Sequence, residues 1–597
     1  MQRISGARGR VTTGGWRLGA SLALALALAA CGGGGGGNAT PAASTSGAAT
    51  VAAGADAPTT ITDAARLAQQ ASFGPTDALI AEIQTAGALK WTARQMTIAA
   101  STYPAAGTDA IDRWTDKNAS WCEGNTEAGS TARLYCWRDN YTATPVVWQF
   151  YRQALGGGDQ LRQRVAFALS QWLVASDVEV YGSYGLRGWQ QMFRDRAFGN
   201  YRDLLRDVML SPVMGEFLNN VNNSKTDPNE NFARELLQLF SIGTCELNHD
   251  GSLKGGNCVA TYDNATVREY AYALTGWTYP AGGASGWCPT GKCDLWKNPR
   301  YLAGAMVAVP AQHDQTVRTL LSGVSLPASR TPDQALEKVL DSIMAHGNTA
   351  PFVARRLIQH LVTGNPSAAY VADVATAFET GRHAGIGAGT RGDLAATVAA
   401  VLLHAEARDA SHITDRGYGR LREPAQLWTA SMRALDAVSD GAWWGWSYGD
   451  EMGQAVFSAP SVFSYYAPDY KPPGSDVTAP AFGIENENTT LNRLALFQFL
   501  NVFTGTPLMV ANTSIADSFG TTVSRARFTG AASDPAALVD RFDLLLTSRQ
   551  LTTRQKQAIV DAVSAISVAT HGADWQAARV RAAGYLAMSS PQYSIVR

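Results

Sequence analysis

The sequence lacks the signatures of several protein classes. It has no HExxH segment, the pattern of many zinc proteases, and no CxxC pair, the usual start of a zinc finger. Charged residues make up only 17% of the 597 residues and the formal net charge is −1, so no surface for nucleic acid is indicated. No long run alternates between apolar and polar residues, and no solenoid repeat is visible. We therefore expect a mainly α-helical globular protein, and we predict no metal and no cofactor.

The first 60 residues have the features of an export signal and a tether. Arginines up to Arg17 precede an apolar run at residues 18–30, which is too short to cross a bilayer and is typical of a signal peptide. The run ends in Leu-Ala-Ala-Cys, which resembles a bacterial lipobox and predicts acylation of Cys31. An ordinary signal peptide with an incidental cysteine is the alternative. Residues 31–60 are rich in Gly, Ala, Ser and Thr, which indicates a flexible tether. We expect a lipid-anchored protein on the extracytoplasmic side of the cell envelope.

Six cysteines remain after Cys31, an even number that suits disulfides in an oxidising compartment. They lie in three pairs that are close in sequence. We predict the disulfides Cys122–Cys136, Cys245–Cys258 and Cys288–Cys293, although six cysteines allow many other connectivities. A metal site is the alternative, which the absence of CxxC pairs and of histidines at finger spacing disfavours.

Apolar residues recur at helical spacing along most of the chain. We expect residues 61–597 to form one large helical domain with little β structure and with loop insertions near 109–143 and 244–309. Four amphipathic helices are predicted in succession at 331–344, 351–363, 368–381 and 393–403. Further helices are predicted at 61–98, 145–176, 200–218, 267–274, 422–435, 486–503 and 534–570.

The most complete helix signal lies at residues 227–243. Asp227 is a favourable N-cap, and Pro228 then falls at the first helical position, where its missing N–H costs nothing. Glu230 follows the cap at the spacing of a capping box, and Gly243 can end the helix. The apolar residues of this stretch fall on one face, which predicts an amphipathic helix with its polar face in water or in a cleft.

That polar face has two interpretations. In the first, Glu230 caps the helix and pairs with Arg234, while Asn231 and Glu235 face water. In the second, Glu230 and Glu235 line a cleft as acid and base, and Asn229, Asn231 and Arg234 hold one carboxyl group charged and the other protonated. A second carboxylate from elsewhere in the chain is a further possibility under this interpretation.

Other residues are candidates for a site. Glu423 and Glu269 are the alternative partner acids. His313, beside Asp314, is a candidate base, or else a histidine that is hydrogen-bonded in a turn. The aromatic cluster of Trp443, Trp444 and Trp446 suits stacking on sugar rings, and equally suits a core or a protein interface.

Several segments together resemble one family, the bacterial domain-of-unknown-function family numbered 1800. The similarity runs in the same order from about residue 62 to the end of the sequence, and it rests on eight segments taken together. They lie at residues 64–76, 159–171, 229–243, 267–277, 351–367, 391–408, 421–428 and 458–474. The resemblance implies an exported protein, often encoded beside a second exported family with a sulfatase-like fold, and it implies no settled reaction.

Two functions follow as expectations. One is an envelope hydrolase that acts on a polymer such as a glycan. Glycosidases use two carboxyl groups at a defined separation, which Glu230 and Glu235 would supply. The other is a non-catalytic scaffold or binding module for a co-expressed exported partner. In both cases we expect contact with the membrane through the lipid anchor only, and no nucleic acid.

Overall fold

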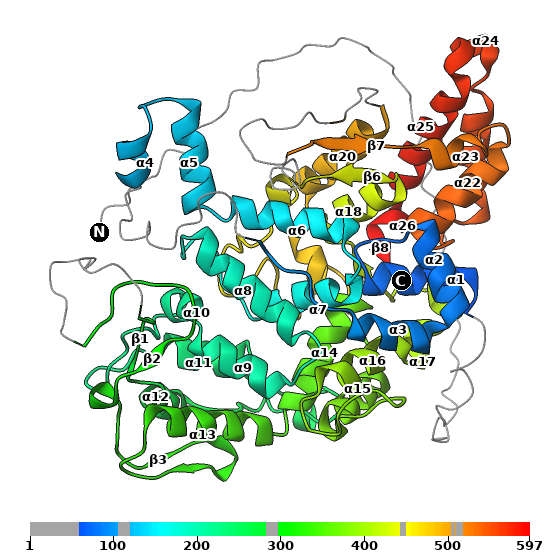
Figure 1. Cartoon of the computed structure of the whole chain (residues 1–597). Helices are drawn as coiled ribbons and strands as arrows, with labels where there is room; N and C mark the ends of the chain where they lie inside the picture. Colours follow the sequence, from blue (N-terminus) through cyan, green and yellow to red (C-terminus); the bar gives the residue numbers. More distant parts are fainter. Residues whose placement is uncertain (1–58, 105–119, 282–295, 442–448, 503–507, 509–517) are drawn as a thin grey trace, which may run out of the picture. The chain divides into compact units, whose positions relative to one another are not determined.

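The computed structural model describes residues 59–104, 120–281, 296–441, 449–502, 508 and 518–597. Helices dominate this part of the chain, as the sequence predicts (Figure 1). The strands described are only two or three residues long and pair as four separate two-stranded antiparallel ladders. The prediction of a mainly α protein is confirmed.

The first half of the described chain is a series of helices. They are α1 (Ile61–Ala71), α2 (Asp77–Ala86), α3 (Ala88–Thr97), α4 (Ser120–Asn125), α5 (Thr131–Tyr141), α6 (Thr144–Gly156), α7 (Gln160–Ser170), α8 (Ser183–Arg196), α9 (Tyr201–Leu210), α10 (Pro212–Phe217), α11 (Asn231–Gln238) and α12 (Asn264–Ala273). Strand β1 (Trp277–Thr278) pairs with β2 (Val307–Ala308), and β3 (Arg318–Thr319) pairs with β4 (Ser325–Leu326).

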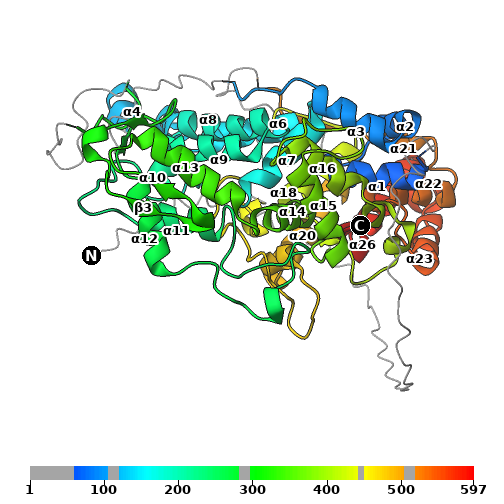
Figure 2. The ribbon, with the colours of Figure 1, turned by 90° about the horizontal axis from the view of Figure 1, so that it is seen from below.

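The four helices predicted in succession are present as α13 (Pro332–Ala345), α14 (Thr349–Leu361), α15 (Ala368–Thr380) and α16 (Leu394–Leu403). Thr331 starts α13 with a capping box, and Pro332 occupies the first helical position. In both Figure 1 and Figure 2, α14 lies among its neighbours α7, α15 and α16, which pack against it.

The last part of the chain returns to the earlier helices. Its elements are α17 (Ala405–Arg408), β5 (Arg420–Leu421), α18 (Pro424–Ala434), β6 (Ala437–Ser439), α20 (Glu487–Val502), β7 (Thr521–Val523), α21 (Ala526–Thr529), α22 (Pro535–Phe542), α23 (Thr553–Ser564), α24 (Val568–His571), α25 (Trp575–Met588), α26 (Pro591–Ser594) and β8 (Ile595–Val596). Strand β6 pairs with β7, and β5 pairs with β8, so the end of the sequence lies beside residues 420–421.

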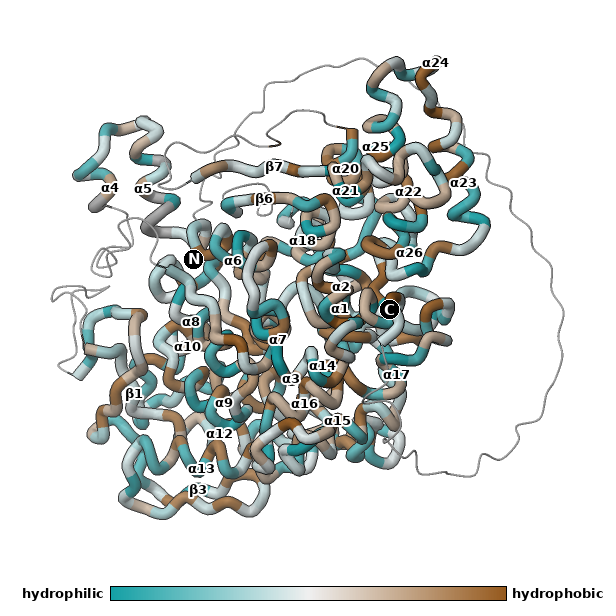
Figure 3. Tube along the Cα trace, turned by 45° about the vertical axis from the view of Figure 1, so that its right-hand side comes forward, coloured by the Kyte–Doolittle hydropathy of each residue, from teal (hydrophilic) through white to brown (hydrophobic). Residues whose placement is uncertain are grey.

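Buried apolar side chains form one cluster that draws on helices from α1 to α26. Each amphipathic helix contributes one face, as α9 does with Leu204, Leu205 and Val208. Figure 3 shows hydrophobic residues in brown and hydrophilic residues in teal, which alternate in bands along the helices. The core also holds fully buried arginines, whose guanidinium groups bind main-chain carbonyl oxygens of distant segments. One example is Arg422, which donates to the carbonyl oxygens of Tyr593 and Leu546.

The helix predicted at 227–243 is shorter than expected. It begins at Asn231 because side chains of the preceding loop satisfy the main-chain amides there: the Asn223 Oδ1 atom accepts from the Asn229 N–H at 2.8 Å, and the Asn229 Oδ1 atom accepts from the Asn231 N–H at 2.9 Å. Asp227 therefore does not cap the helix. The chain turns at Gly243, whose φ of 75° is left-handed as predicted.

The insertion predicted as an irregular loop near 109–143 contains helices α4 and α5, which the Cys122–Cys136 disulfide joins. The structure also contains α8, which the periodicity analysis did not predict. Residues 244–262 form the expected hairpin-like excursion, closed by the Cys245–Cys258 disulfide and by the bridge between Cys245 and Ala260. These two disulfide predictions are confirmed.

Candidate active site

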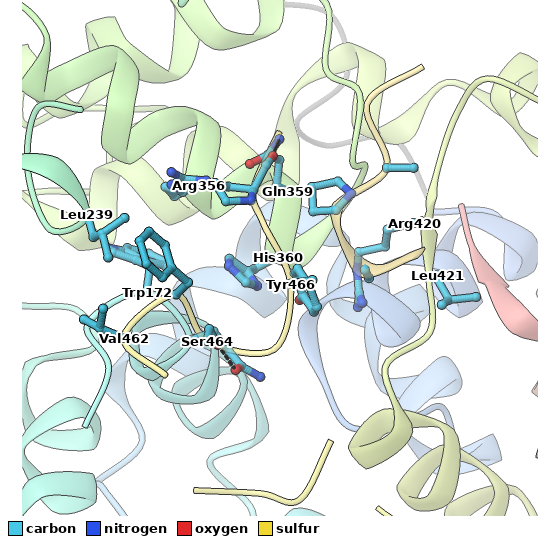
Figure 4. A pocket seen from close by; sticks show the side chains of 16 residues that line it. Trp172, Leu239, Arg356, Gln359, His360, Arg420, Leu421, Val462, Ser464 and Tyr466 are labelled. Carbon is cyan, nitrogen blue, oxygen red and sulfur yellow. Dashed lines mark hydrogen bonds between the residues drawn. The ribbon is translucent and has the colours of Figure 1, made fainter. Parts of the chain in front are cut away.

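A pocket lies where α14 faces the segment 462–481 and the residues around β5 (Figure 4). It encloses about 680 Å³ of empty space, part of which is open to solvent. Apolar side chains, with Trp172, Leu239, Val462 and Pro480 among them, form much of the wall. The polar lining consists of Gln171, Arg356, Gln359, His360, Arg420, Ser464 and Tyr466.

Helix α14 supplies the centre of the polar lining. Arg356 and His360 are four positions apart and so lie one above the other on the same face. The face behind them is committed to the core through Val353, Leu357 and Leu361, which are fully buried. The packed helix thus fixes the positions of the Arg356 and His360 side chains.

The His360 imidazole is available for chemistry. It stacks on the Trp172 ring with 5.7 Å between ring centroids. Within the described residues, neither ring nitrogen makes a hydrogen bond. Burial, together with the neighbouring cations Arg164, Arg356 and Arg420, lowers the pKa of His360 to about 3, although Glu423 raises it. The imidazole is therefore neutral at physiological pH.

Glu423 lies directly behind the pocket lining. It precedes Pro424, the first residue of α18, and so its carboxylate sits at the positive end of that helix. The side chain is 1% exposed, and its Oε1 atom accepts hydrogen bonds from Tyr466 at 2.7 Å, Gln454 at 2.9 Å and Gln171 at 3.3 Å. Two of these donors, Tyr466 and Gln171, line the pocket.

The charge on Glu423 is maintained despite its burial. Burial raises the pKa of its carboxyl group, but the positive charges of Arg420 and Arg164 lower it, and the net shift is downward. The Nη1 atom of Arg420 lies 3.8 Å from the Glu423 Oε2 atom. Arg164 lies close by and donates to the main-chain oxygen of His360 and, at 3.4 Å, to Gln426. An ionised carboxylate and the Arg164 guanidinium group therefore lie behind a pocket wall that contains Arg356 and Arg420.

The segment 462–481 closes the other side of the pocket. Ser464 has a left-handed φ of 64°, a strained conformation for a residue other than glycine. Its hydroxyl group donates to the Gln171 side chain at 3.3 Å. Phe463, at the rim, is 51% exposed, so an aromatic ring faces the solvent at the pocket opening.

The residues predicted on α11 lie away from this pocket. Glu230 pairs with Arg234 at 3.1 Å, as the first interpretation predicts, and both side chains are partly exposed. Glu235 is partly buried, and burial raises its pKa. Asn229 and Asn231 hydrogen-bond to the loop before the helix. Leu239, just after α11, does line the pocket, but the polar face does not. The acid–base roles proposed for these residues remain predictions.

His313 is fully buried, and its Nδ1 atom lies 2.9 Å from the Thr275 carbonyl oxygen. This is the hydrogen-bonded arrangement in a turn that the sequence allows. Glu269 forms an ion pair with Arg318 at 3.1 Å and also lies outside the pocket. Of the acids considered as partners, only Glu423 reaches the pocket lining.

Other predictions fall outside the described residues. They concern Cys31, the Cys288–Cys293 disulfide, and the Trp443, Trp444 and Trp446 cluster. A GxSxG pattern at residues 445–449 lies almost wholly in the same undescribed segment. The nucleophile elbow that this pattern marks needs a strand of a larger sheet before it, and the described part of the chain has only two-stranded ladders.

A family model described as a protein of unknown function (DUF1800) matches residues 66–595. The chain belongs to this family. No curated protein and no solved structure matches the chain. Five of the segments on which the DUF1800 resemblance rests meet at the pocket. Those segments, at 159–171, 229–243, 351–367, 421–428 and 458–474, contribute Gln171, Leu239, His360, Leu421 and Tyr466 respectively to its lining. This convergence is the signal that could have located the site.

The described part of the chain shows neither a metal-binding cluster nor a membrane-spanning helix. No cluster of three or more His, Cys, Asp or Glu side chains there is arranged to hold a metal ion. None of the helices in that part of the chain has the length and apolar character needed to span a membrane. The two disulfides fit an extracytoplasmic protein.

Proposed function

We propose that this protein is a lipid-anchored hydrolase of the cell envelope and that its reaction takes place in the pocket on α14. The observation that carries the proposal is His360, a neutral imidazole without a hydrogen bond among the described residues, which faces a pocket backed by the ionised Glu423. Imidazole groups are the commonest general bases in enzymes. The substrate is a polymer such as a glycan. The acylated Cys31 keeps the enzyme near the membrane.

In this proposal His360 takes a proton from a water molecule while the water oxygen attacks the substrate. The same proton then passes to the oxygen of the leaving group. The negative charge of Glu423 stabilises the imidazolium ion that forms in between, and Tyr466, Gln454 and Gln171 hold the carboxylate in place. Water is the nucleophile in this scheme, since the Ser464 hydroxyl group is directed to Gln171.

The carboxyl groups near the pocket indicate which type of bond is hydrolysed. Cleavage of a glycosidic bond usually needs two carboxyl groups that flank it. In the described part of the chain, Glu423 is the carboxylate that contacts the lining residues, and it is hydrogen-bonded and buried. An imidazole base with one supporting carboxylate suits the hydrolysis of an ester carried by the polymer.

The test is turnover on a panel of esterified and unesterified envelope glycans. We expect His360→Asn to reduce kcat by about 100-fold or more, since it removes the base and keeps the volume. His249→Asn is the matched control, because His249 is an exposed histidine paired with Glu379 outside the pocket. Turnover by His360→Asn at the parent rate, with both variants folded, would exclude this mechanism.

A second candidate is a non-catalytic binding module for a co-expressed exported partner. The exposed Phe463 ring at the pocket opening supports it, because exposed aromatic rings are frequent in binding surfaces. Binding without turnover of any substrate on the panel, and loss of binding on Phe463→Ala, would favour this candidate.

A further inference from the structure

The positive charge around the pocket exceeds the negative charge. Among the described residues with the largest influence on the pKa of His360 are three guanidinium groups, those of Arg164, Arg356 and Arg420, and one carboxylate, that of Glu423. Asp469, whose negative charge raises the pKa of Arg356, is exposed to solvent. A surplus of buried positive charge is costly for a protein to maintain without a partner.

Several N–H donors of these arginines have no acceptor. The Nε and Nη1 atoms of Arg164 and of Arg420 are buried and make no hydrogen bond in the described part of the chain, although the Nη1 atom of Arg420 forms an ion pair with the Glu423 Oε2 atom at 3.8 Å. The two side chains are at most 4% exposed. Buried donors normally find a partner, and charged donors lose most when they do not. The Arg420 side chain lines the pocket, so a ligand there can supply the missing acceptor.

Arg356 is the third guanidinium group near His360. Its guanidinium lies 5.0 Å from the centre of the Phe352 ring, and within the described residues it has neither a hydrogen bond nor an ion pair. Figure 4 shows Arg356 and Arg420 on the same pocket, with His360 and Tyr466 between them. A guanidinium group presents a planar set of donors that matches the oxygens of a carboxylate, sulfate or phosphate group.

We propose that this pocket binds an oxyanion, the carboxylate, sulfate or phosphate group of a larger molecule, through Arg356, Arg420 and His360. The apolar wall with Trp172 and Val462 strengthens each charged contact by excluding water. The pocket is partly open to solvent, so the molecule that carries the oxyanion can extend out of it. The inference rests on the proposed function only in identifying this molecule with the substrate, which is then an acidic polymer.

A bound oxyanion is expected to raise the pKa of His360. Arg164, Arg356 and Arg420 lower the pKa of this imidazole, and Glu423 raises it. An added negative charge beside the arginines offsets their effect and raises the pKa, which makes the imidazole a better base only when the ligand is in place. Binding is therefore expected to draw a proton from solution as the pH is lowered.

The direct test is calorimetric titration of the purified protein with inorganic phosphate, sulfate, acetate and glucuronate, and with glucose as the uncharged control. We expect at least one oxyanion to bind and glucose not to bind. Repetition in buffers of different ionisation enthalpy measures proton uptake, which should increase as the pH is lowered. The ranking of glucuronate against sulfate and phosphate identifies the kind of acidic group.

Arg356→Gln tests the assignment of the residues. It removes a charge from a half-buried position, and we expect about tenfold weaker binding with an unchanged melting temperature. Arg355→Gln is the matched control, because Arg355 is the adjacent residue, donates to the Gly251 carbonyl oxygen and does not line the pocket. Arg420→Gln is expected to weaken binding further, and its melting temperature is measured because Arg420 is buried.

The outcomes separate this inference from the proposed function. Failure of every oxyanion to bind, or parent affinity in Arg356→Gln, overturns the oxyanion site even if neutral esters are hydrolysed. Oxyanion binding that Arg356→Gln weakens, in a protein that turns over no substrate, supports the site and counts against the hydrolase.

Discussion

At the scale of single residues, the Glu235 carboxyl group is partly buried with few interactions that would stabilise its charge. Its Oε2 atom is buried without a hydrogen bond among the described residues, and burial raises its pKa although Arg234 lowers it. The folded protein therefore holds this proton more tightly than the unfolded chain. Stability is retained below the ordinary pKa of glutamate and is lost as the pH rises above it, because the folded protein must then bury a charge.

Glu235→Gln keeps the shape of the side chain and removes this charge. We expect the variant to be more stable than the parent at pH 7, by less than about 1 kcal/mol because the group is partly exposed, and the difference to disappear near pH 4. Thermal melting at both pH values measures it. Glu230→Gln is the control, since Glu230 is already paired with Arg234 and no gain is expected. Lower stability of Glu235→Gln at pH 7 would show that this carboxylate is satisfied in the folded protein.

The same two variants test the acid–base hypothesis for α11. If either carboxyl group takes part in catalysis, its glutamine variant loses turnover without a loss of stability. Retained turnover in both variants, together with its loss in His360→Asn, would place the reaction in the pocket on α14.

At the scale of elements, the sequence predicts the long helices well and their surroundings less well. Helices α13 to α16 are recognisable because apolar residues repeat over three or four turns in each. Helix α4 has only 6 residues, too few for a periodic pattern, and α5 has 11 residues but does not separate apolar from polar residues on two faces. The sequence pattern predicts the start of α11 too early. The Asn223 side chain, which is outside the pattern, hydrogen-bonds to the main chain of Asn229 and keeps the preceding residues in a loop.

The disulfide hairpin at 244–262 is an element whose contribution can be measured. The Cys245–Cys258 disulfide joins residues 13 apart, and Asn348 binds the hairpin through the carbonyl oxygen of Cys245 at 2.9 Å and the N–H of Leu247 at 3.0 Å. A loop of this length is expected to contribute about 3 kcal/mol by restricting the unfolded chain.

We expect the double variant Cys245→Ala, Cys258→Ala to melt at a lower temperature and to be cleaved faster by protease within residues 246–257. Both effects follow from greater opening of the hairpin. Cys122→Ala, Cys136→Ala is the control, since it removes the other described disulfide and leaves this hairpin closed. Protease resistance equal to that of the parent would mean that the contacts of Asn348 suffice to hold the hairpin.

At the scale of the whole molecule, the pocket depends on segments that are distant in the sequence. The periodic pattern predicts α14 but not the role of Arg356 and His360, because their partners come from the residues before α18 and from segment 462–481. Pairing between β5 and β8, strands of two residues some 170 positions apart, leaves no local signal. The chemistry of the site is thus a property of the assembled fold.

The last residues of the sequence hold one wall of this site. The Arg422 N–H donates to the Ser594 carbonyl oxygen at 2.7 Å, and β8 pairs with Arg420 and Leu421. Arg66 of α1 donates to the main-chain oxygen of Arg597 at 3.3 Å, so α1 and the end of the chain lie side by side in Figure 1. Gly419, with a φ of 104°, allows β5 to approach Val596 closely.

Deletion of residues 595–597 is therefore expected to affect the pocket as well as the stability. Loss of the buried Val596 side chain and of the β5–β8 ladder should cost about 2–4 kcal/mol, measured by thermal melting. Without its strand partner Arg420 is no longer fixed, so oxyanion affinity should fall with it. Arg597→Ala is the control, because it removes the side-chain contact with Gln550 and keeps the β8 main chain. A truncated protein with parent affinity for oxyanions would show that α14 alone positions the anion.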